Sequence, residues 1–205
     1  MKELKDLFIK HGKQVNYKKN DIVFNEHELC ESVGYITKGK IKISTITNEE
    51  NEYVINLLKN DEIFGDLLVF SSNPRYYGIA ICQEYTQVIY ISKNKLLSLF
   101  KEDSSLLSHF LKIITDKGVY LKQLNKMYAH KNIEERIMYY LKHVAKKTSN
   151  EAIYYKSLTD IAHILSVPRP SLSRSIHNLE RLGYIKINKH LIELIITTSK
   201  TGGLL

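Results

Sequence analysis

The stretch SLTDIAHILSVPRPSLSRSIHNLERLG, from Ser157 to Gly183, decides the fold because it reads as two short amphipathic helices joined by a tight turn. Thr159 is the expected N-cap of the first helix, whose inward positions are Ile161, Ala162 and Leu165. Pro170 suits the first turn of the second helix, where no backbone N–H is needed. That helix would bury Leu172, Ile176 and Leu179. The pattern predicts a helix-turn-helix.

The outer face of the second helix is basic and polar. Positions 170, 173, 174 and 177 fall at helical spacing and share one side of the helix. A helix of this kind fits the major groove of duplex DNA, where Arg pairs with guanine and Ser bonds to bases or phosphates. The alternative is a plain helical hairpin that only packs its own core. The candidate DNA contacts on this helix are Arg169, Pro170, Ser171, Ser173, Arg174 and His177, with Arg181 on the same face.

A short hairpin follows the second helix. Residues 184–194 alternate between apolar and polar side chains around Asn188, Lys189 and His190. A hairpin in this place is a wing, and Lys186 and Lys189 could lie along DNA phosphates. We therefore expect a winged helix-turn-helix.

The charge is concentrated in the same part of the chain. The protein has 205 residues, 43% of them hydrophobic, and a formal net charge of +8. Residues 131–205 contain 12 basic and 6 acidic residues, so most of the excess lies there. This favours a polyanionic partner, although the charge could serve solubility alone.

The sequence also indicates the cellular compartment in which the protein works. No apolar run is long enough to span a bilayer, and no secretory leader opens the sequence. The only cysteines, Cys30 and Cys82, form no disulfide framework. We expect a cytoplasmic protein without a membrane partner.

The first half of the chain reads as strands. Between residues 15 and 93, short β-type runs alternate with turn residues such as Lys38-Gly39-Lys40. Even spacing of short strands predicts an antiparallel barrel or sandwich. Cys82 lies in one of these runs and is expected in its core.

From Lys95 to Tyr128 the apolar residues change to helical spacing, with a cap at Asp103. The helix is apolar on more than one side, so one side could pack on the strands and another on a partner helix. Gly118 interrupts it, and we expect a packing reason rather than a break. Asn132 begins the next helix. The candidate dimer interface is Leu107, Phe110, Leu111, Ile114, Leu121, Leu124 and Tyr128.

Taken together, these motifs resemble the Crp/Fnr family of bacterial transcription regulators over nearly the full chain. Lys38-Gly39, the cassette from Phe64 to Arg75, Glu135-Arg136-Ile137 and the helix from Arg169 to Arg174 carry the resemblance. It implies an α+β fold: an N-terminal antiparallel β-roll sensor at 1–102, a long dimerisation helix and hinge at 103–130, and a winged helix-turn-helix at 131–205. It also implies a homodimer on a near-palindromic operator, with RNA polymerase as a further candidate partner. Two departures are Pro170, where the family usually has Glu, and Ser166, where it usually has Gly.

The resemblance raises the question of a cyclic nucleotide in the β-roll. The candidate effector residues are Gly65, Asp66, Arg75, Tyr76 and, on the long helix, Leu121. Arg75 could pair with a phosphate, and Asp66 stands where the family has Glu. Tyr76 stands where binders have Ser or Thr, and its ring would intrude into the cavity. The sequence thus allows a cyclic nucleotide but disfavours it; Arg75 could instead form a structural ion pair.

Other functions find less support in these residues. An iron–sulfur cluster needs about four cysteines, twice the number present. Haem ligation or thiol redox sensing could use His27, Cys30 or Cys82, but no motif marks them. No enzyme motif or metal-ligand set is present, so we expect neither an enzyme nor a metal site. The prediction is a homodimeric, sequence-specific DNA-binding regulator with a possible effector. The alternatives are an effector-independent regulator with a degenerate pocket and an RNA- or protein-binding module.

Overall fold

The computed structural model describes residues 2–46, 52–148 and 152–195. It divides into two compact units, Met1–Ile114 and Thr115–Leu205. The division falls inside the long helix α3 (Ser104–Tyr128), so each unit contains part of that helix. Among the residues described, no helix combines the length and apolar character needed to cross a bilayer.

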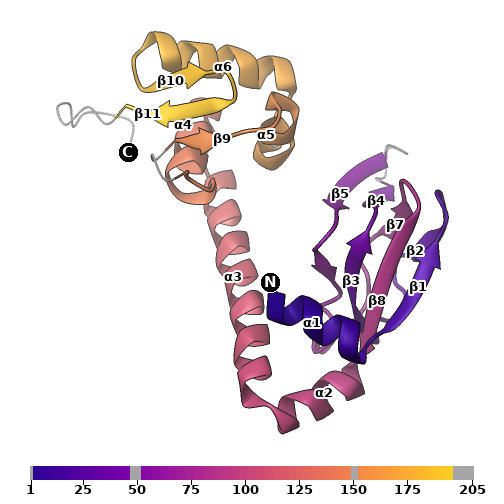
Figure 1. The fold of residues 1–205 in the computed structure, drawn as a ribbon. Helices are drawn as coiled ribbons and strands as arrows, with labels where there is room; N and C mark the ends of the chain where they lie inside the picture. The colour runs from indigo at the N-terminus through magenta and orange to yellow at the C-terminus, as the bar shows by residue number, and fades with distance from the viewer. Residues whose placement is uncertain (1, 47–51, 149–151, 196–205) are drawn as a thin grey trace. The chain divides into compact units, whose positions relative to one another are not determined.

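The first unit is a β-roll of two antiparallel four-stranded sheets (Figure 1), in the orders β1-β8-β3-β6 and β2-β7-β4-β5. A helix that the sequence did not predict, α1 (Lys2–His11), precedes the strands. The strands are β1 (Lys13–Tyr17), β2 (Ile22–Phe24), β3 (Ser32–Lys38), β4 (Ile41–Ile46), β5 (Glu52–Leu58), β6 (Ile63–Phe64), β7 (Ile79–Cys82) and β8 (Thr86–Ser92).

The core of this unit forms where inward positions of both sheets meet. Val33, Ile36, Ile41 and Val88 are all fully buried, as is Cys82, which confirms its expected place in the core. Gly39 makes the turn between β3 and β4 with φ of 106°. A side chain there would meet the carbonyl of Tyr85 at 2.7 Å, so the turn requires glycine.

Two helices follow the roll where the sequence predicts helical spacing. Helix α2 (Lys93–Glu102) ends at Asp103, whose Oδ1 accepts a hydrogen bond from the Ser105 N–H at 2.8 Å at the start of α3. The predicted cap is therefore present. Helix α3 continues through Gly118 without a break.

The second unit is a winged helix-turn-helix. Helix α4 (Ile133–Tyr139) is capped by Asn132, as predicted, and passes into a π-helical turn at Tyr140–Val144. Helices α5 (Leu158–Leu165) and α6 (Arg169–Arg181) pack with a three-stranded sheet in the order β10-β11-β9. Its strands are β9 (Ile153–Tyr154), β10 (Ile185–Asn188) and β11 (Leu191–Leu194). The predicted fold class is confirmed.

One cap differs from the prediction. Ser157, not Thr159, is the N-cap of α5, and its Oγ accepts from the Asp160 N–H at 3.1 Å. Ser157 has extended backbone dihedrals, which an N-cap requires. Thr159 lies inside the helix instead.

Candidate DNA interface and sensor pocket

The turn between α5 and α6 fixes the direction of α6. Ser166 adopts a left-handed conformation with φ of 51°, in the place where a glycine is usual. The Val167 N–H then donates to the Ala162 carbonyl at 3.0 Å. Pro170 lies in the first turn of α6, as predicted. Leu172, Ile176 and Leu179 are buried, so the opposite face of α6 is turned away from the core.

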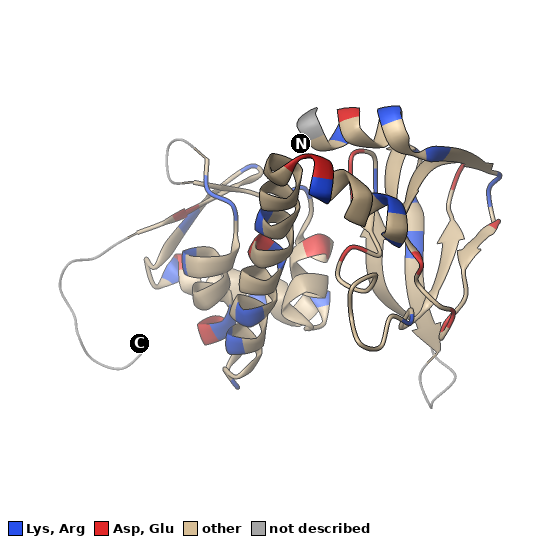
Figure 2. Ribbon diagram, turned by 90° about the horizontal axis from the view of Figure 1, so that it is seen from below, with Lys and Arg blue, Asp and Glu red and all other residues tan. Residues whose placement is uncertain are grey.

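That opposite face carries the predicted DNA contacts. Arg169, Pro170, Arg174 and His177 are exposed, and Ser171 and Ser173 are half-buried. All six therefore lie on or beside one accessible side of a single helix. Figure 2 shows blue segments outnumbering red ones on the helices and hairpin of the second unit.

No carboxylate of the described residues neutralises the arginines of α6. Within the described part of the chain, no ion pair involves Arg169, Arg174 or Arg181. Arg174 Nε makes only a long 3.4 Å contact to the Pro170 carbonyl, and Arg181 donates to Asn178 Oδ1 at 2.8 Å. These guanidinium groups keep donors for an outside partner.

Two nearby acidic residues are engaged elsewhere. Glu180 Oε1 accepts from the Ile187 N–H at 3.0 Å and so fixes the start of the wing. Glu134 Oε1 accepts from Asn178 Nδ2 at 2.7 Å and joins α4 to α6. Both carboxylates serve the packing of the domain.

The wing places its lysines in solvent. Strands β10 and β11 pair antiparallel from Ile185–Leu194 to Asn188–Leu191. Lys186 and Lys189 are exposed, and Lys189 occupies the hairpin turn with φ of 52°. The Tyr155 hydroxyl donates to the Lys189 carbonyl at 2.9 Å and so supports the turn.

A set of contacts that the sequence did not reveal holds α5 in place. Arg136 donates from Nη1 to the Leu165 carbonyl at 2.9 Å and from Nη2 to the His130 carbonyl at 2.9 Å. The Tyr128 hydroxyl donates to the Ile164 carbonyl at 2.7 Å. The bonds to Leu165 and Ile164 satisfy carbonyls at the C-terminal end of α5, and the bond to His130 ties Arg136 to the segment that follows α3. Long-range pairing of this kind leaves no periodic signal in the sequence.

The long helix presents part of the predicted dimer face. Leu107, Leu111, Leu121 and Tyr128 are exposed, with Leu121 51% accessible. Ile114 and Leu124 are half-buried against the cores of the first and second unit, respectively. The prediction that Phe110 lies on the dimer face is wrong. Its side chain is 5% exposed and packs with Phe70 and Phe100 inside the first unit. It is a core residue, not a free surface residue.

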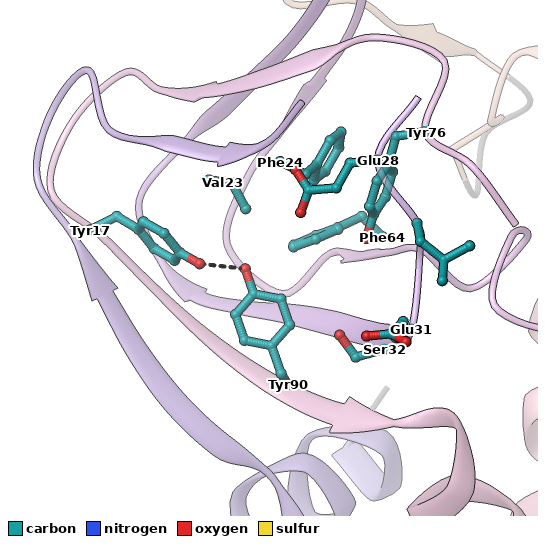
Figure 3. Close-up of a pocket in the computed structure, with 10 residues that line it drawn as sticks. Tyr17, Val23, Phe24, Glu28, Glu31, Ser32, Phe64, Tyr76 and Tyr90 are labelled. Carbon is teal, nitrogen blue, oxygen red and sulfur yellow. Dashed lines mark hydrogen bonds between the residues drawn. The ribbon is translucent and has the colours of Figure 1, made fainter. Parts of the chain in front are cut away.

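The β-roll contains a pocket of about 280 Å³ (Figure 3). Its lining comes from segments far apart in the sequence: Tyr17, Val23, Phe24, Glu28, Leu29, Glu31, Ser32, Phe64, Tyr76 and Tyr90. Of the predicted effector residues, only Tyr76 lines it. Sequence reasoning missed Tyr17, Glu28, Glu31 and Tyr90. Tyr17 and Tyr90 lie on the paired strands β1 and β8, and Glu31 directly precedes β3, the other neighbour of β8, so these residues converge only when strands far apart in the sequence pair.

Tyr76 enters the pocket as the sequence suggested. Its ring stacks on Phe24 with centroids 3.6 Å apart and an interplanar angle of 8°. Burial, and then the hydrogen bond with Cys30, raise the pKa of Tyr76. Burial also raises the pKa of Tyr17 and of Tyr90, whose hydroxyls lie 2.9 Å apart. All three phenols therefore stay neutral at physiological pH.

The remaining cassette residues lie outside the pocket lining. Arg75 is exposed, and its Nη1 donates to the His27 carbonyl at 2.7 Å. Asp66 is buried, and Gly65 has φ of 77° beside Cys30. Leu121 belongs to the second unit. Of the four predicted effector residues in the first unit, Tyr76 lines this cavity and Gly65, Asp66 and Arg75 do not.

No group of three or more His, Cys, Asp or Glu side chains that could hold a metal ion occurs in the described ranges. Cys30 and Cys82 are both buried and unbonded to each other. Burial is the main cause that raises the pKa of each thiol.

Comparison with known proteins agrees with this architecture. Residues 14–103 match the family model described as cyclic nucleotide-binding domain. The anaerobic regulatory protein of Bacillus subtilis is 29% identical over 94 residues, which cover 46% of this chain and 40% of that protein. The match therefore spans less than half the length of this curated relative.

Solved structures extend the likeness along the chain. A transcriptional regulator from Thermotoga maritima is 27% identical, with a TM-score of 0.51 over 56% of this chain and 88% of that one. CprK in complex with OCPA is 18% identical, with a TM-score of 0.68 over 95% of this chain and 91% of that one. FixK2 from Bradyrhizobium japonicum is 15% identical, with a TM-score of 0.56 over 89% of this chain and 92% of that one. The last two likenesses concern the fold alone.

Proposed function

We propose that this chain is a member of the Crp/Fnr family of transcription regulators and a homodimer that binds near-palindromic duplex DNA. The match to the cyclic nucleotide-binding domain and the likeness to the anaerobic regulatory protein support this proposal. Helix α6 would enter the major groove and the wing would follow the phosphates. The observation that carries the proposal is the exposed basic face of α6, whose arginines have no acidic partner in the described chain.

Each predicted contact has a physical role in this proposal. The guanidinium groups of Arg169 and Arg174 could each donate two hydrogen bonds to guanine O6 and N7. Ser171, Ser173 and His177 can bond to bases or phosphates. Pro170 has no hydrogen-bond donor, so it can contribute only an apolar contact. Lys186 and Lys189 would neutralise phosphates and position the domain without reading sequence.

The long helix supports the dimer. Residues 107, 111, 114, 118, 121, 125 and 128 follow spacings of four and three, which is the seam of a coiled coil. Gly118 lies on this seam with open space around it: beyond its own helix backbone and chain neighbours, no atom lies within 4 Å of the place that a Cβ would take. A second helix could approach closely at such a glycine, which would supply the packing reason expected from the sequence.

We further propose that the β-roll regulates DNA binding, that the protein acts in the cytoplasm, and that it meets RNA polymerase at promoters. A cyclic nucleotide remains disfavoured as the signal, because Tyr76 fills part of the pocket and Arg75 is turned to the His27 carbonyl. If no signal exists, the protein is an effector-independent regulator.

In vitro selection from random duplexes, followed by genome-wide mapping of bound sites, tests DNA binding directly. On the selected operator, Arg174→Ala should cost roughly 1–3 kcal/mol by fluorescence anisotropy. Lys18→Ala, which removes one exposed charge from the first unit, serves as the control and should leave affinity unchanged. Unchanged affinity of Arg174→Ala would refute its assigned role, and equal competition by RNA would favour an RNA-binding module instead.

A further inference from the structure

The pocket of the β-roll is walled by aromatic rings. Phe24 stacks on Tyr76 and lies 5.8 Å from Phe64, and Phe64 meets Tyr90 edge-on at 5.9 Å, all between ring centroids. Tyr17 closes the wall through its hydrogen bond to Tyr90, drawn in Figure 3. The faces of aromatic rings carry partial negative charge and attract cations.

The charged residues in the lining have the same sign. Glu28 and Glu31 line the pocket, and none of the described residues that line it is Lys or Arg. Glu28 is held in place, because its Oε2 accepts from the Asn25 N–H at 2.9 Å. Figure 3 shows the Glu28 carboxylate beside Phe24 and the Glu31 carboxylate beside Ser32, at another place in the lining.

The negative charge of Glu28 acts on the hydroxyls of two tyrosines in the lining. After burial, its charge is among the causes that raise the pKa of Tyr17 and of Tyr76, which belong to different strands and loops. The hydroxyls of Tyr17, Tyr90 and Ser32 supply further oxygen atoms that can accept hydrogen bonds. Among the described lining residues, a ligand phosphate would meet two carboxylates and no cation.

The volume limits the ligand to a small molecule. A cavity of about 150 Å³ is enough for benzene, whereas pockets for drug-sized ligands begin near 300 Å³. At about 280 Å³ this pocket suits a ligand with one ring or one trimethylammonium group.

We propose that this pocket binds a small organic ammonium ion, enclosed by the aromatic rings and paired with Glu28 and Glu31. This deepens the proposed function, because such a cation would be the signal that the regulator senses. The recognition chemistry is cation–π attraction from the rings together with charge pairing by the two carboxylates.

Isothermal titration calorimetry on the full-length protein tests the proposal with two matched pairs of probes. Choline is compared with its neutral isostere 3,3-dimethyl-1-butanol, and benzylammonium with benzyl alcohol. We expect at least one cation to bind roughly tenfold or more tightly than its neutral isostere. Binding of neither cation, or equal binding within both pairs, would overturn the proposal.

Three variants locate the site. Glu28→Gln and Glu31→Gln keep the side-chain shape but remove the charge, so each should weaken the cation about tenfold while leaving the neutral isostere unaffected. Glu26→Gln is the control, since Glu26 accepts from Thr45 and does not line the pocket. Equal affinity of all three variants for the cation would overturn the assignment.

The outcome is separable from the proposed function. Operator binding by the ligand-free protein tests DNA recognition alone, whereas calorimetry without DNA tests the pocket alone. A protein that binds the operator but neither cation would lose only the pocket proposal. If cyclic AMP binds to the protein and Phe24→Ala abolishes that binding, the ligand of this pocket is a nucleotide and not an ammonium ion.

Discussion

Ser166 shows how a single residue can hold strain at the turn that directs α6. Its φ of 51° lies in the left-handed region, which costs a residue other than glycine about 1–2 kcal/mol. The same conformation closes the helix end, because the Ser166 N–H donates to the His163 carbonyl at 3.1 Å. The strain is therefore part of how the turn is made.

Ser166→Gly should raise the free energy of unfolding by about 0.5–1 kcal/mol. Glycine removes the left-handed strain but adds chain entropy to the unfolded state, which offsets part of the gain. Urea unfolding measures the change. Ser166→Ala keeps the strain and should show no gain; an equal gain in both variants would mean that the serine hydroxyl, not the backbone, is the cause.

Tyr35 and Asp61 form a hydrogen bond that makes stability depend on pH. Tyr35 is buried in the roll, and its hydroxyl donates to Asp61 Oδ1. This hydrogen bond, followed by the charge of Lys5, lowers the pKa of Asp61 in the folded state. A lowered folded-state pKa stabilises the protein above the unfolded-state pKa, and the stabilisation is lost as the pH falls through the folded-state value.

In Tyr35→Phe, the free energy of unfolding should therefore depend less on pH in the acid range. Between about pH 5 and about pH 3, the wild-type protein should lose more free energy of unfolding than the variant, because Asp61 then titrates nearer its ordinary pKa. Urea unfolding at both pH values measures this difference. Tyr77→Phe changes an exposed tyrosine and should keep the wild-type slope; a wild-type slope in Tyr35→Phe would remove Asp61 as the source.

At the scale of elements, α3 has different surroundings along its length. Near its start, Phe110 belongs to the core of the first unit, and near its end Met127 belongs to that of the second. Between them, Leu111 and Leu121 are each more than half exposed. Large apolar side chains along one helical seam indicate a surface for a partner helix.

Leu121→Glu should weaken the proposed dimer at least about tenfold, because it would bury a carboxylate without a partner. Sedimentation velocity over a concentration series measures the dissociation constant. Leu97→Glu is the matched control, since Leu97 is an exposed leucine of α2. An unaltered dimer in Leu121→Glu would exclude this part of α3 from the interface.

The sequence predicts those elements whose signal is local, and it misses features that depend on contacts between residues far apart in the chain. Periodicity and capping residues locate α3, α4 and α6, because the period and the cap are local properties. The same reasoning misses α1. It also misses the Ser157 cap of α5, since Ser157 and Thr159 are equally good N-cap candidates until the backbone is known. Glu28 and Glu31 in the pocket are missed as well, because this part of the chain meets Tyr90 only when β3 pairs with β8, about 55 residues further along the chain.

At the scale of the whole molecule, the asymmetry of charge matches the division of labour in the proposed function. Residues 131–205 carry 12 basic against 6 acidic residues, whereas the remainder of the chain is nearly balanced. The basic residues that we assign to phosphates, Lys186 and Lys189, are exposed on the wing. A dimer would bring two copies of this wing to one operator.

Affinity for the operator should therefore depend on salt twice as steeply for a complete site as for a half-site. Each phosphate contact contributes a slope of about −0.9 to the logarithm of the binding constant against the logarithm of salt concentration. Anisotropy titrations at several KCl concentrations give both slopes. Lys186→Ala should reduce the complete-site slope by about two, since it acts once in each copy, whereas Lys18→Ala should leave it unchanged. Equal slopes for the half-site and the complete site would mean that one copy binds alone, and the palindromic arrangement would then have no physical basis.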